Sequence, residues 1–164
     1  MGSGKSSVGR ELPALLSLPG GPFDFIDLDE YIVESEGMSV NEIFARDGES
    51  GFRSIETQCL ETLLGQYESR NLVLALGGGT AVFNSSLIHG KTVCIYLSAT
   101  TDALVDRLAS DSSRPLLSGA DDLRARIEKL YAVREEVYRR TAHHTIATDH
   151  ISIDEIASRI AGLF

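Results

Sequence analysis

The chain opens on a glycine-rich segment that ends in a lysine and two serines, Gly2-Ser3-Gly4-Lys5-Ser6-Ser7. It matches the second half of G-x-x-x-x-G-K-[S/T], in which glycines let the backbone curl so that its N–H groups point at phosphate oxygens. In that pattern Lys5 brings a positive charge to the β- and γ-phosphates, and the Ser6 hydroxyl is placed to hold Mg²⁺. A helix that begins at Lys5 directs the positive end of its dipole at the same anions. The motif therefore predicts a nucleotide-phosphate site at the start of a helix.

The first half of this motif is absent from the sequence as it stands. Its first glycine belongs two residues before Met1, and a buried strand belongs in front of that glycine. We expect Met1 to be an internal residue of the phosphate loop, with roughly ten more residues ahead of it, from the length of a strand plus the missing glycine. The alternative is a chance GSGKS in a linker, and the helical pattern that starts at once at Ser6 argues against it.

Apolar runs and helix-period segments alternate along the rest of the chain. The expected strands are 23–27, 71–76, 92–97 and, with a weaker pattern, 144–147. The expected helices are 5–18, 40–47, 52–67, 101–109, 122–140 and 153–163, and Pro13 should kink or shorten the first. Strands that are apolar throughout and separated by helices are typical of βαβ units around a parallel sheet. We therefore predict a single α/β domain over residues 1–164, with a long polar loop at 110–122.

Acidic residues outnumber basic ones, with 24 Asp and Glu against 15 Lys and Arg and a formal net charge of −9. This balance argues against a nucleic-acid partner and against binding to an anionic membrane surface. No apolar run approaches the roughly 18 residues that a membrane span requires. Cys59 and Cys94 are isolated cysteines, which fits a reducing compartment. We expect a cytoplasmic protein.

Two carboxylates, Asp27 and Asp29, come at the end of the first predicted strand. Residues two apart in a strand point to the same side, and ligands bind at the carboxyl ends of the strands in an open parallel sheet. One carboxylate can then lie near a metal while the other accepts a proton from a substrate hydroxyl. The alternative is that Asp29 merely caps a helix that starts near Glu30. Beside a phosphate loop we favour the site.

Three consecutive glycines, Gly77-Gly78-Gly79, close the second predicted strand at the same edge. They allow close backbone approach and offer N–H donors to a ligand oxygen, whereas a plain strand-to-helix turn is the simpler alternative. Arg53 stands at the start of a predicted helix, where a cation is unfavourable unless it has an anionic partner. Glu56, one turn later, can hold that guanidinium in place for a bound carboxylate. Without such a partner Arg53 would be an ordinary solvated residue.

Three more arginines are candidates for contact with anionic ligands. Arg114, in the 110–122 loop, can swing over the phosphates as a lid and neutralise charge in the transition state. Arg107, shortly before it, can stack on an adenine base. Arg134 lies on the predicted helix that runs toward Tyr138, whose remaining arginines we interpret as surface charges.

Taken together, these residues resemble the shikimate kinase family. The motifs, in order, are GSGKS at Gly2, D-x-D at Asp27, G-x-x-x-F-R-x-x-E from Gly48 to Glu56, GGG at Gly77, RPLL at Arg114 and R-x-x-x-Y at Arg134. The resemblance covers nearly the whole chain. It implies a three-layer α/β/α P-loop kinase fold with a five-stranded parallel sheet, of which this chain lacks the central first strand. It also implies transfer of the ATP γ-phosphate to the 3-hydroxyl of shikimate, on the route to chorismate and the aromatic amino acids.

The resemblance also implies roles for individual residues and a monomer that binds shikimate and ATP. ATP would be bound, with the help of Arg107, by Gly2, Ser3, Gly4, Lys5, Ser6, Ser7 and, from the lid at 110–122, Arg114. Mg²⁺ would be coordinated by Ser6 and reached through water by Asp27. Shikimate would be bound by Asp29, Arg53, Gly77, Gly78, Gly79 and Arg134, with the helical segment 30–64 forming much of its site. The catalytic residues would be Lys5, Arg114 and Asp29, the last as the base.

The sequence departs from the family pattern beyond its missing strand. The loop before the 23–27 strand is longer than usual, and the segment after Thr148, where many relatives offer an arginine to adenine, reads Asp149-His150-Ile151. Two other hypotheses remain: another small-molecule kinase, such as a gluconate kinase, or a truncated paralogue that binds ligand without turnover. The pair Arg53 and Arg134 favours a carboxylated, ring-like substrate.

Overall fold

The computed structural model describes residues 2–108 and 123–164. The strands in these ranges are β1 (Phe23–Asp27), β2 (Asn71–Ala75), β3 (Ile95–Ser98) and β4 (His144–Ala147). The helices are α1 (Lys5–Leu15), α2 (Leu28–Glu36), α3 (Val40–Gln66), α4 (Thr80–Phe83), α5 (Ser85–His89), α6 (Thr101–Leu108), α7 (Leu123–Thr141) and α8 (Ile153–Ala161). The four strands lie where they were predicted, and so do the helices other than α2, α4 and α5, which the sequence pattern did not predict. The expected start of the third strand at Thr92 is wrong, because the backbone N–H of Thr92 donates to Ile88 O at the end of α5 instead of joining the sheet.

Local sequence explains how two of the helices begin and break. α1 follows Gly4, whose φ of 85° lies in the left-handed region that glycine adopts most easily, and it ends two residues after Pro13 rather than at Leu18. α3 starts with a capping box in which Ser39 and Glu42 bond reciprocally to each other's backbone N–H. Gly48, with φ 68° and ψ −173°, interrupts it, so the two helices predicted at 40–47 and 52–67 are the two halves of α3.

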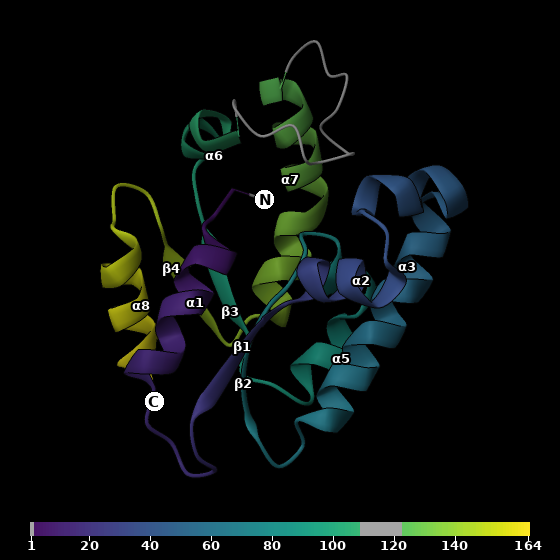
Figure 1. Cartoon of the computed structure of the whole chain (residues 1–164). Coiled ribbons are helices and arrows are strands. Elements are labelled where there is room, and N and C mark those ends of the chain that lie inside the picture. Colours follow the sequence, from purple (N-terminus) through teal and green to yellow (C-terminus); the bar gives the residue numbers. More distant parts are fainter. Residues whose placement is uncertain (1, 109–122) are drawn as a thin grey trace.

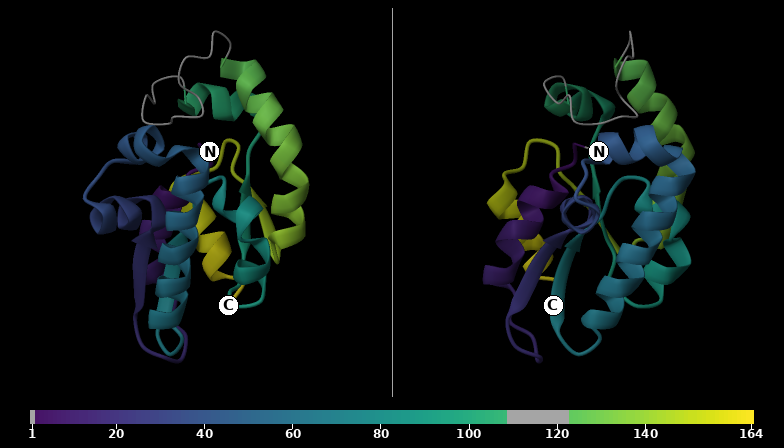
Figure 2. Two further views of the ribbon diagram at one scale, coloured as in Figure 1. Left: turned by 90° about the vertical axis from the view of Figure 1, so that its right-hand side faces the viewer. Right: turned by 45° about the vertical axis from the view of Figure 1, so that its right-hand side comes forward.

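Helices cover the strands on two sides (Figures 1 and 2), which gives three layers. On one side α1 and α8 pack together, and Val8, Leu12 and Ile160 form a core with partly buried Val73 and Ile95 from the strands. On the other side α2, α3 and α5 enclose a second core, which Ile26 and Leu74 join from the strands. Because neighbouring strand residues such as Val73 and Leu74 face opposite cores, the strands lie between two helical layers.

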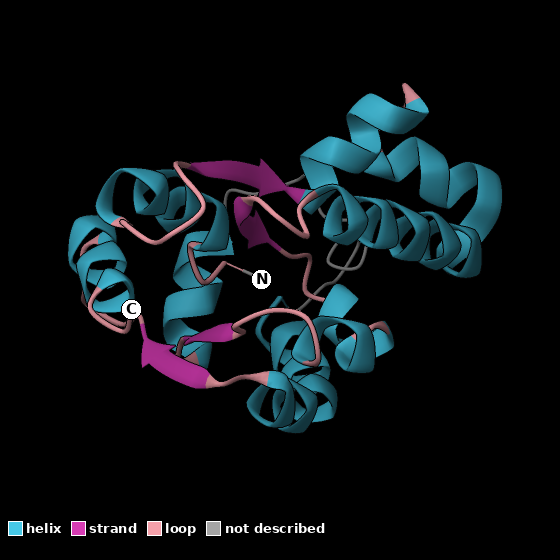
Figure 3. Cartoon of the chain, turned by 90° about the horizontal axis from the view of Figure 1, so that it is seen from below, coloured by secondary structure: helices cyan, strands magenta, loops and turns pink. Residues whose placement is uncertain are grey.

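The strands form two separate parallel pairs rather than one continuous sheet. β1 pairs with β2, with Phe23 opposite Asn71 and Asp27 opposite Ala75, and β3 pairs with β4, with Ile95 opposite His144. Seen along the strands in Figure 3, the two pairs stand apart, with the N-terminus between them. The parallel pairing is the predicted one.

The carboxyl ends of all four strands converge on the phosphate loop. Asp27, at the end of β1, accepts a hydrogen bond from Ser6, and Gly77, just after β2, lines a pocket together with Lys5. Beyond β3 and β4, Arg107 of α6 donates both to Thr148 O and to Gly2 O. None of the described helices is both long enough and apolar enough to cross a membrane.

Candidate active site

The phosphate loop lines a polar pocket of about 250 Å³ at this edge. Gly2 and Gly4 have φ angles of 65° and 85°, so the loop uses the conformational freedom of glycine twice. The residues around the pocket are Gly2, Gly4, Lys5, Ser6, Ser7, Asp27, Asp29, Leu76, Gly77, Gly78, Arg107 and Leu108. All predicted ATP ligands are among them except Ser3, which is buried facing a neighbouring cavity, and Arg114, which lies outside the described residues, as does the predicted lid at 110–122.

Ser6 and Asp27 form the contact expected of a metal-binding pair. The Ser6 hydroxyl donates to Asp27 Oδ2 at 2.5 Å, and Asp27 Oδ1 accepts the backbone N–H of Asp29 at 3.0 Å. Asp27 is therefore the N-cap of α2, and the alternative in which Asp29 is only the cap is wrong. Asp29 lies in the first turn of α2 and lines the same pocket as Asp27. The argument from strand alternation does not hold, because the chain turns into a helix at Leu28.

A buried ion pair between Arg53 and Glu56 forms the wall of the site on the side of Asp29 away from the phosphate loop. Arg53 Nη1 lies 2.8 Å from Glu56 Oε2, and the Glu56 side chain is completely buried. Thr80 donates to the other carboxylate oxygen of Glu56 at 2.6 Å. Both oxygens of the buried carboxylate are thus engaged, which is the condition for keeping such a charge inside a protein. Glu56 holds the guanidinium as predicted.

The three glycines lie directly against these charged groups. A Cβ on Gly79 would lie 2.3 Å from Arg53 Nη2, so the guanidinium occupies the space that any side chain at this position would need. A Cβ on Gly77 would come within 3.1 Å of Asp29 Oδ1 and within 3.4 Å of Glu56 Oε1. Gly77 therefore fits between the two carboxylates, and the triple glycine is more than a turn.

Tyr138 of α7 reaches the same loop, and Arg134 lies one turn before it on that helix. Arg134 is buried, and the Tyr138 hydroxyl donates to the backbone oxygen of Gly78. Burial raises the pKa of Tyr138 above its ordinary value, whereas the nearby cations Arg134 and Arg53 lower it. Tyr138 therefore keeps its proton at neutral pH and remains a donor to the glycine loop. Sequence reasoning assigned no role to Tyr138, although its place four residues after Arg134, on the same helix face, was the available signal.

Comparison with known proteins identifies the family. A family model described as shikimate kinase matches residues 1–163. The chain belongs to the shikimate kinase family. The shikimate kinase of Mannheimia succiniciproducens is 36% identical over 165 residues, which cover 99% of this chain and 90% of the relative. That of Francisella tularensis subsp. novicida is 36% identical over 163 residues, covering 98% and 88%.

Solved structures of shikimate kinases have the same fold. Shikimate kinase from Acinetobacter baumannii in complex with shikimate aligns with a TM-score of 0.89 at 33% identity, covering 99% of this chain and 87% of the other. The enzyme from Bacteroides thetaiotaomicron aligns with a TM-score of 0.84 at 30% identity, covering 99% and 93%. The predicted family, fold class and kinase activity are thereby confirmed.

The donor set at Ser6 and Asp27 fits the magnesium ion that nucleotide kinases use. A hydroxyl and a carboxylate are hard oxygen ligands, and Mg²⁺ is commonly held by one or two such side chains together with phosphate oxygens and water. The described residues contain no cluster of three or more His, Cys, Asp or Glu side chains that could hold a metal without a nucleotide. The pair therefore suits an ion that phosphate oxygens and water also coordinate.

Proposed function

We propose that this chain transfers the γ-phosphoryl group of ATP to the 3-hydroxyl of shikimate with the residues of this site. The observation that carries the proposal is the place of Asp29. It lines the phosphate pocket with Lys5, and it lies against Gly77 within the wall that contains Arg53. A hydroxyl held beside Asp29 is thus within reach of both a phosphate and a carboxylate site. Such an arrangement serves phosphoryl transfer, in which positioning and electrostatics supply most of the catalysis.

ATP binds at the phosphate loop in this proposal. The backbone N–H groups of residues 2–7 surround the phosphates, Lys5 supplies the positive charge, and Arg107 supports the loop from Gly2 O and contacts the nucleotide. Ser6 and Asp27 would hold Mg²⁺, which when bound neutralises charge on the phosphate oxygens. Arg114, which lies outside the described residues, would supply a further positive charge to the phosphates.

The shikimate carboxylate binds to Arg53 and Arg134. Arg53 is fixed by Glu56, and its Nε atom is buried without a hydrogen-bond partner in the described part of the chain, so the guanidinium is not saturated. The N–H groups of the Gly77–Gly79 loop add donors. Two guanidinium groups and backbone N–H donors suit a carboxylate, because such bonds are charge-assisted and directional.

Asp29 acts as the base. It accepts the proton of the 3-hydroxyl as the oxygen attacks the γ-phosphorus, while Lys5 stabilises the charge on the phosphates. Closure of the site over both substrates excludes water and so limits hydrolysis of ATP. The enzyme works as a monomer in the cytoplasm, and light scattering on the purified protein tests the oligomeric state.

An ADP-release assay with shikimate, gluconate and nucleoside monophosphates tests the proposal. Of the three acceptors, we expect only shikimate to cause release of ADP from ATP. Asp29→Asn should lower the rate of this release by roughly 10²- to 10⁴-fold while ATP binding is retained. Retained turnover in Asp29→Asn would remove Asp29 as the base. Binding of shikimate and ATP without ADP release would favour the non-catalytic alternative, and a response to gluconate alone would favour the other kinase.

A further inference from the structure

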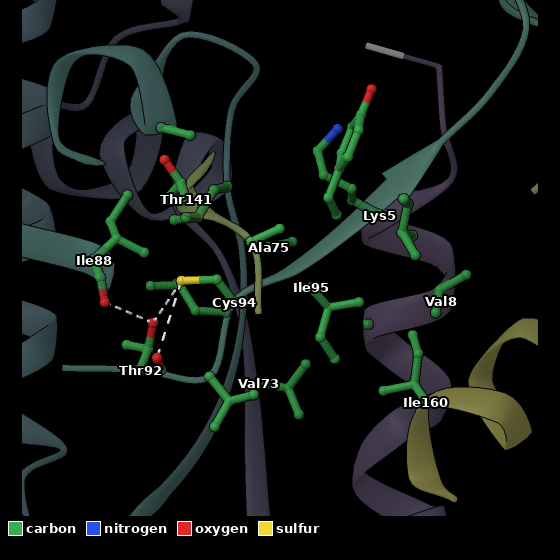
Figure 4. A pocket seen from close by; sticks show the side chains of 18 of the residues that line it. Lys5, Val8, Val73, Ala75, Ile88, Thr92, Cys94, Ile95, Thr141 and Ile160 are labelled. Carbon is green, nitrogen blue, oxygen red and sulfur yellow. Dashed lines mark hydrogen bonds between the residues drawn. The ribbon is translucent and has the colours of Figure 1, made fainter. Parts of the chain in front are cut away.

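The glycine loop leads directly into α4, a helix of only four residues that contacts α3. So short a helix is not stable by itself, and its place therefore depends on contacts with other elements. On one side, Ala81 of α4 lines an apolar cavity of about 650 Å³. Figure 4 shows Ile88 of α5 and Val73 and Ala75 of β2 among the side chains around this cavity. On the side that faces α3, by contrast, α4 contacts charged groups.

Two hydrogen bonds join α4 to the helix that carries Arg53. Thr80 is completely buried, and its hydroxyl donates to Glu56 Oε1 at 2.6 Å. Asn84, the C-cap of α4, accepts the hydroxyl of Thr57 at 2.9 Å. The two partners on α3 are consecutive residues, whereas the two on α4 are about one helical turn apart. The pair of bonds therefore fixes the rotation of α4 as well as its position.

Phe83, the last residue of α4, lies over the guanidinium of Arg53. Arg53 Cζ is 5.0 Å from the centroid of the Phe83 ring and 5.1 Å from that of Phe52. Both distances lie within the roughly 6 Å over which an aromatic ring attracts a cation. Phe83 is 56% exposed, whereas the Arg53 side chain is only 11% exposed. A ring so exposed adds little to the core, but it keeps water away from the cation beneath it.

The contacts around Arg53 restrict its guanidinium without saturating it. Glu56 binds Nη1 at 2.8 Å, and Glu49 lies 3.5 Å from Nη2. The Nε atom is buried and has no hydrogen-bond partner in the part of the chain that the structure describes. A guanidinium held in this way has lost much of its rotational freedom before a ligand arrives. Binding an anion to it then requires less ordering of the side chain.

We propose that α4 is a positioning element for the substrate carboxylate, in which Phe83 and Thr80 act through Arg53 rather than on the reacting atoms. Phe83 limits the motion and the hydration of the guanidinium from the solvent side. Thr80 fixes the carboxylate of Glu56, which in turn fixes the guanidinium. This inference rests on the proposed role of Arg53 in binding the shikimate carboxylate and adds the residues that prepare it for that role.

The Nε–H group of Arg53 provides a test that needs no substrate. Its ¹H–¹⁵N resonance, assigned by its loss in Arg53→Lys, should exchange slowly with water because the atom is buried. Phe83→Leu should speed this exchange at least tenfold, and Phe83→Trp should keep it slow. Phe164→Leu is the matched control, because Phe164 is 50% exposed and its ring has no contact with Arg53 among the described interactions. Equal exchange rates in Phe83→Leu and in the unchanged protein would overturn the proposal.

Steady-state kinetics test the consequence for the substrate. Phe83→Leu should raise the KM for shikimate about fivefold and leave kcat and the KM for ATP unchanged, whereas Phe83→Trp should keep all three. Added salt should raise the KM for shikimate more steeply in Phe83→Leu, because ions screen an uncovered guanidinium more strongly. If exchange at Arg53 becomes faster while the KM for shikimate stays the same, the positioning role is wrong.

Thr80 is tested by the same split between KM and kcat. Thr80→Val keeps the shape of the side chain but removes the donor to Glu56, so the KM for shikimate should rise about tenfold with a smaller change in kcat. Thr80→Ser restores a hydroxyl and should restore the KM. Thr62→Val is the control, because that hydroxyl donates to Gln58 O within α3. A KM in Thr80→Ser as high as in Thr80→Val would contradict the role of the hydroxyl.

These measurements separate the inference from the proposed function. If the unchanged protein releases no ADP with shikimate, the proposed function fails, and the exchange rate at Arg53 Nε still decides whether α4 holds the guanidinium. If shikimate is turned over and Phe83→Leu changes neither the exchange rate nor the KM, the proposed function stands and this inference is overturned.

Discussion

The two sides of the candidate site are built in different ways. The phosphate side is mostly backbone, shaped by left-handed glycines and supported by single contacts from Asp27 and Arg107. The substrate side is a set of interlocked side chains, with buried Glu56 between Arg53 and Thr80. The first depends on the few contacts that support the loop. The second is held together by contacts among its own side chains, so a change there should affect stability as well as binding.

The phosphate side should lose chemistry without losing the fold. Lys5→Ala removes the cation of the loop, and we expect kcat to fall by roughly 10²- to 10³-fold, since charge stabilisation in the transition state is lost. Tm should change by less than about 2 °C. Steady-state kinetics and thermal unfolding measure both. A large drop in Tm with little change in kcat would reverse the contrast between the two sides.

The substrate side should respond first in stability. Glu56→Ala leaves Arg53 without its buried partner, which we expect to cost about 3 kcal/mol and to lower Tm by roughly 6–12 °C. Glu49→Ala is the matched control, because that carboxylate lies 3.5 Å from the same guanidinium but is 47% exposed. Calorimetry on both variants distinguishes them. Equal Tm values would mean that the buried pair contributes no more than the exposed one.

A gentler change should separate binding from stability within the wall. Arg53→Lys keeps the charge but loses the planar fork, so the KM for shikimate should rise about tenfold while kcat changes less. Arg46→Lys, on an exposed arginine bonded to Asp47, should leave KM unchanged. Initial rates over a range of shikimate concentrations provide the measurement. An unchanged KM in Arg53→Lys would count against the carboxylate role.

The smallest effect is expected at Tyr138. Tyr138→Phe removes the donor to Gly78 O, and a fewfold rise in the KM for shikimate should follow, with ATP kinetics unchanged. Because the folded pKa of Tyr138 is raised, its contribution to stability is complete below about pH 10, where the unfolded tyrosine is protonated, and is lost as the pH rises further. In denaturant titrations between pH 9 and 11, the free energy of unfolding should decline less steeply with pH in Tyr138→Phe than in the unchanged protein. Parallel declines would exclude this contribution.

Local patterns predict much of the fold. The apolar run that follows the loop 19–22, rich in proline and glycine, locates β1 to the residue, and the weaker pattern at 144–147 locates β4 to the residue. Gly48 separates the two halves of α3 as expected. α4 and α5 have four and five residues, too few for a helical period to register. α2 follows β1 without an intervening loop, so the sequence of its first turn is easily taken for the end of the strand.

The residues of the candidate site also fall into two groups, those that local sequence predicts and those whose contacts depend on the fold. Motif residues such as Ser6 and Arg53 are predictable because their chemistry depends on residue type and spacing. The contacts of Thr80 and Tyr138 are not, because they join elements that only the fold brings together. The separation of the strands into two pairs depends likewise on which edges meet in space.

The packing of the Arg53 guanidinium against Gly79 restricts which substitutions position 79 can tolerate. A single base change converts a glycine codon into one for alanine, serine, valine or another residue with a side chain. Each of these would push a carbon into the guanidinium, and the residue that moves would be Arg53 rather than the new one. A substitution at position 79 would then be selected against because it displaces Arg53, and a survey of tolerated variants should show that positions 79 and 53 change together.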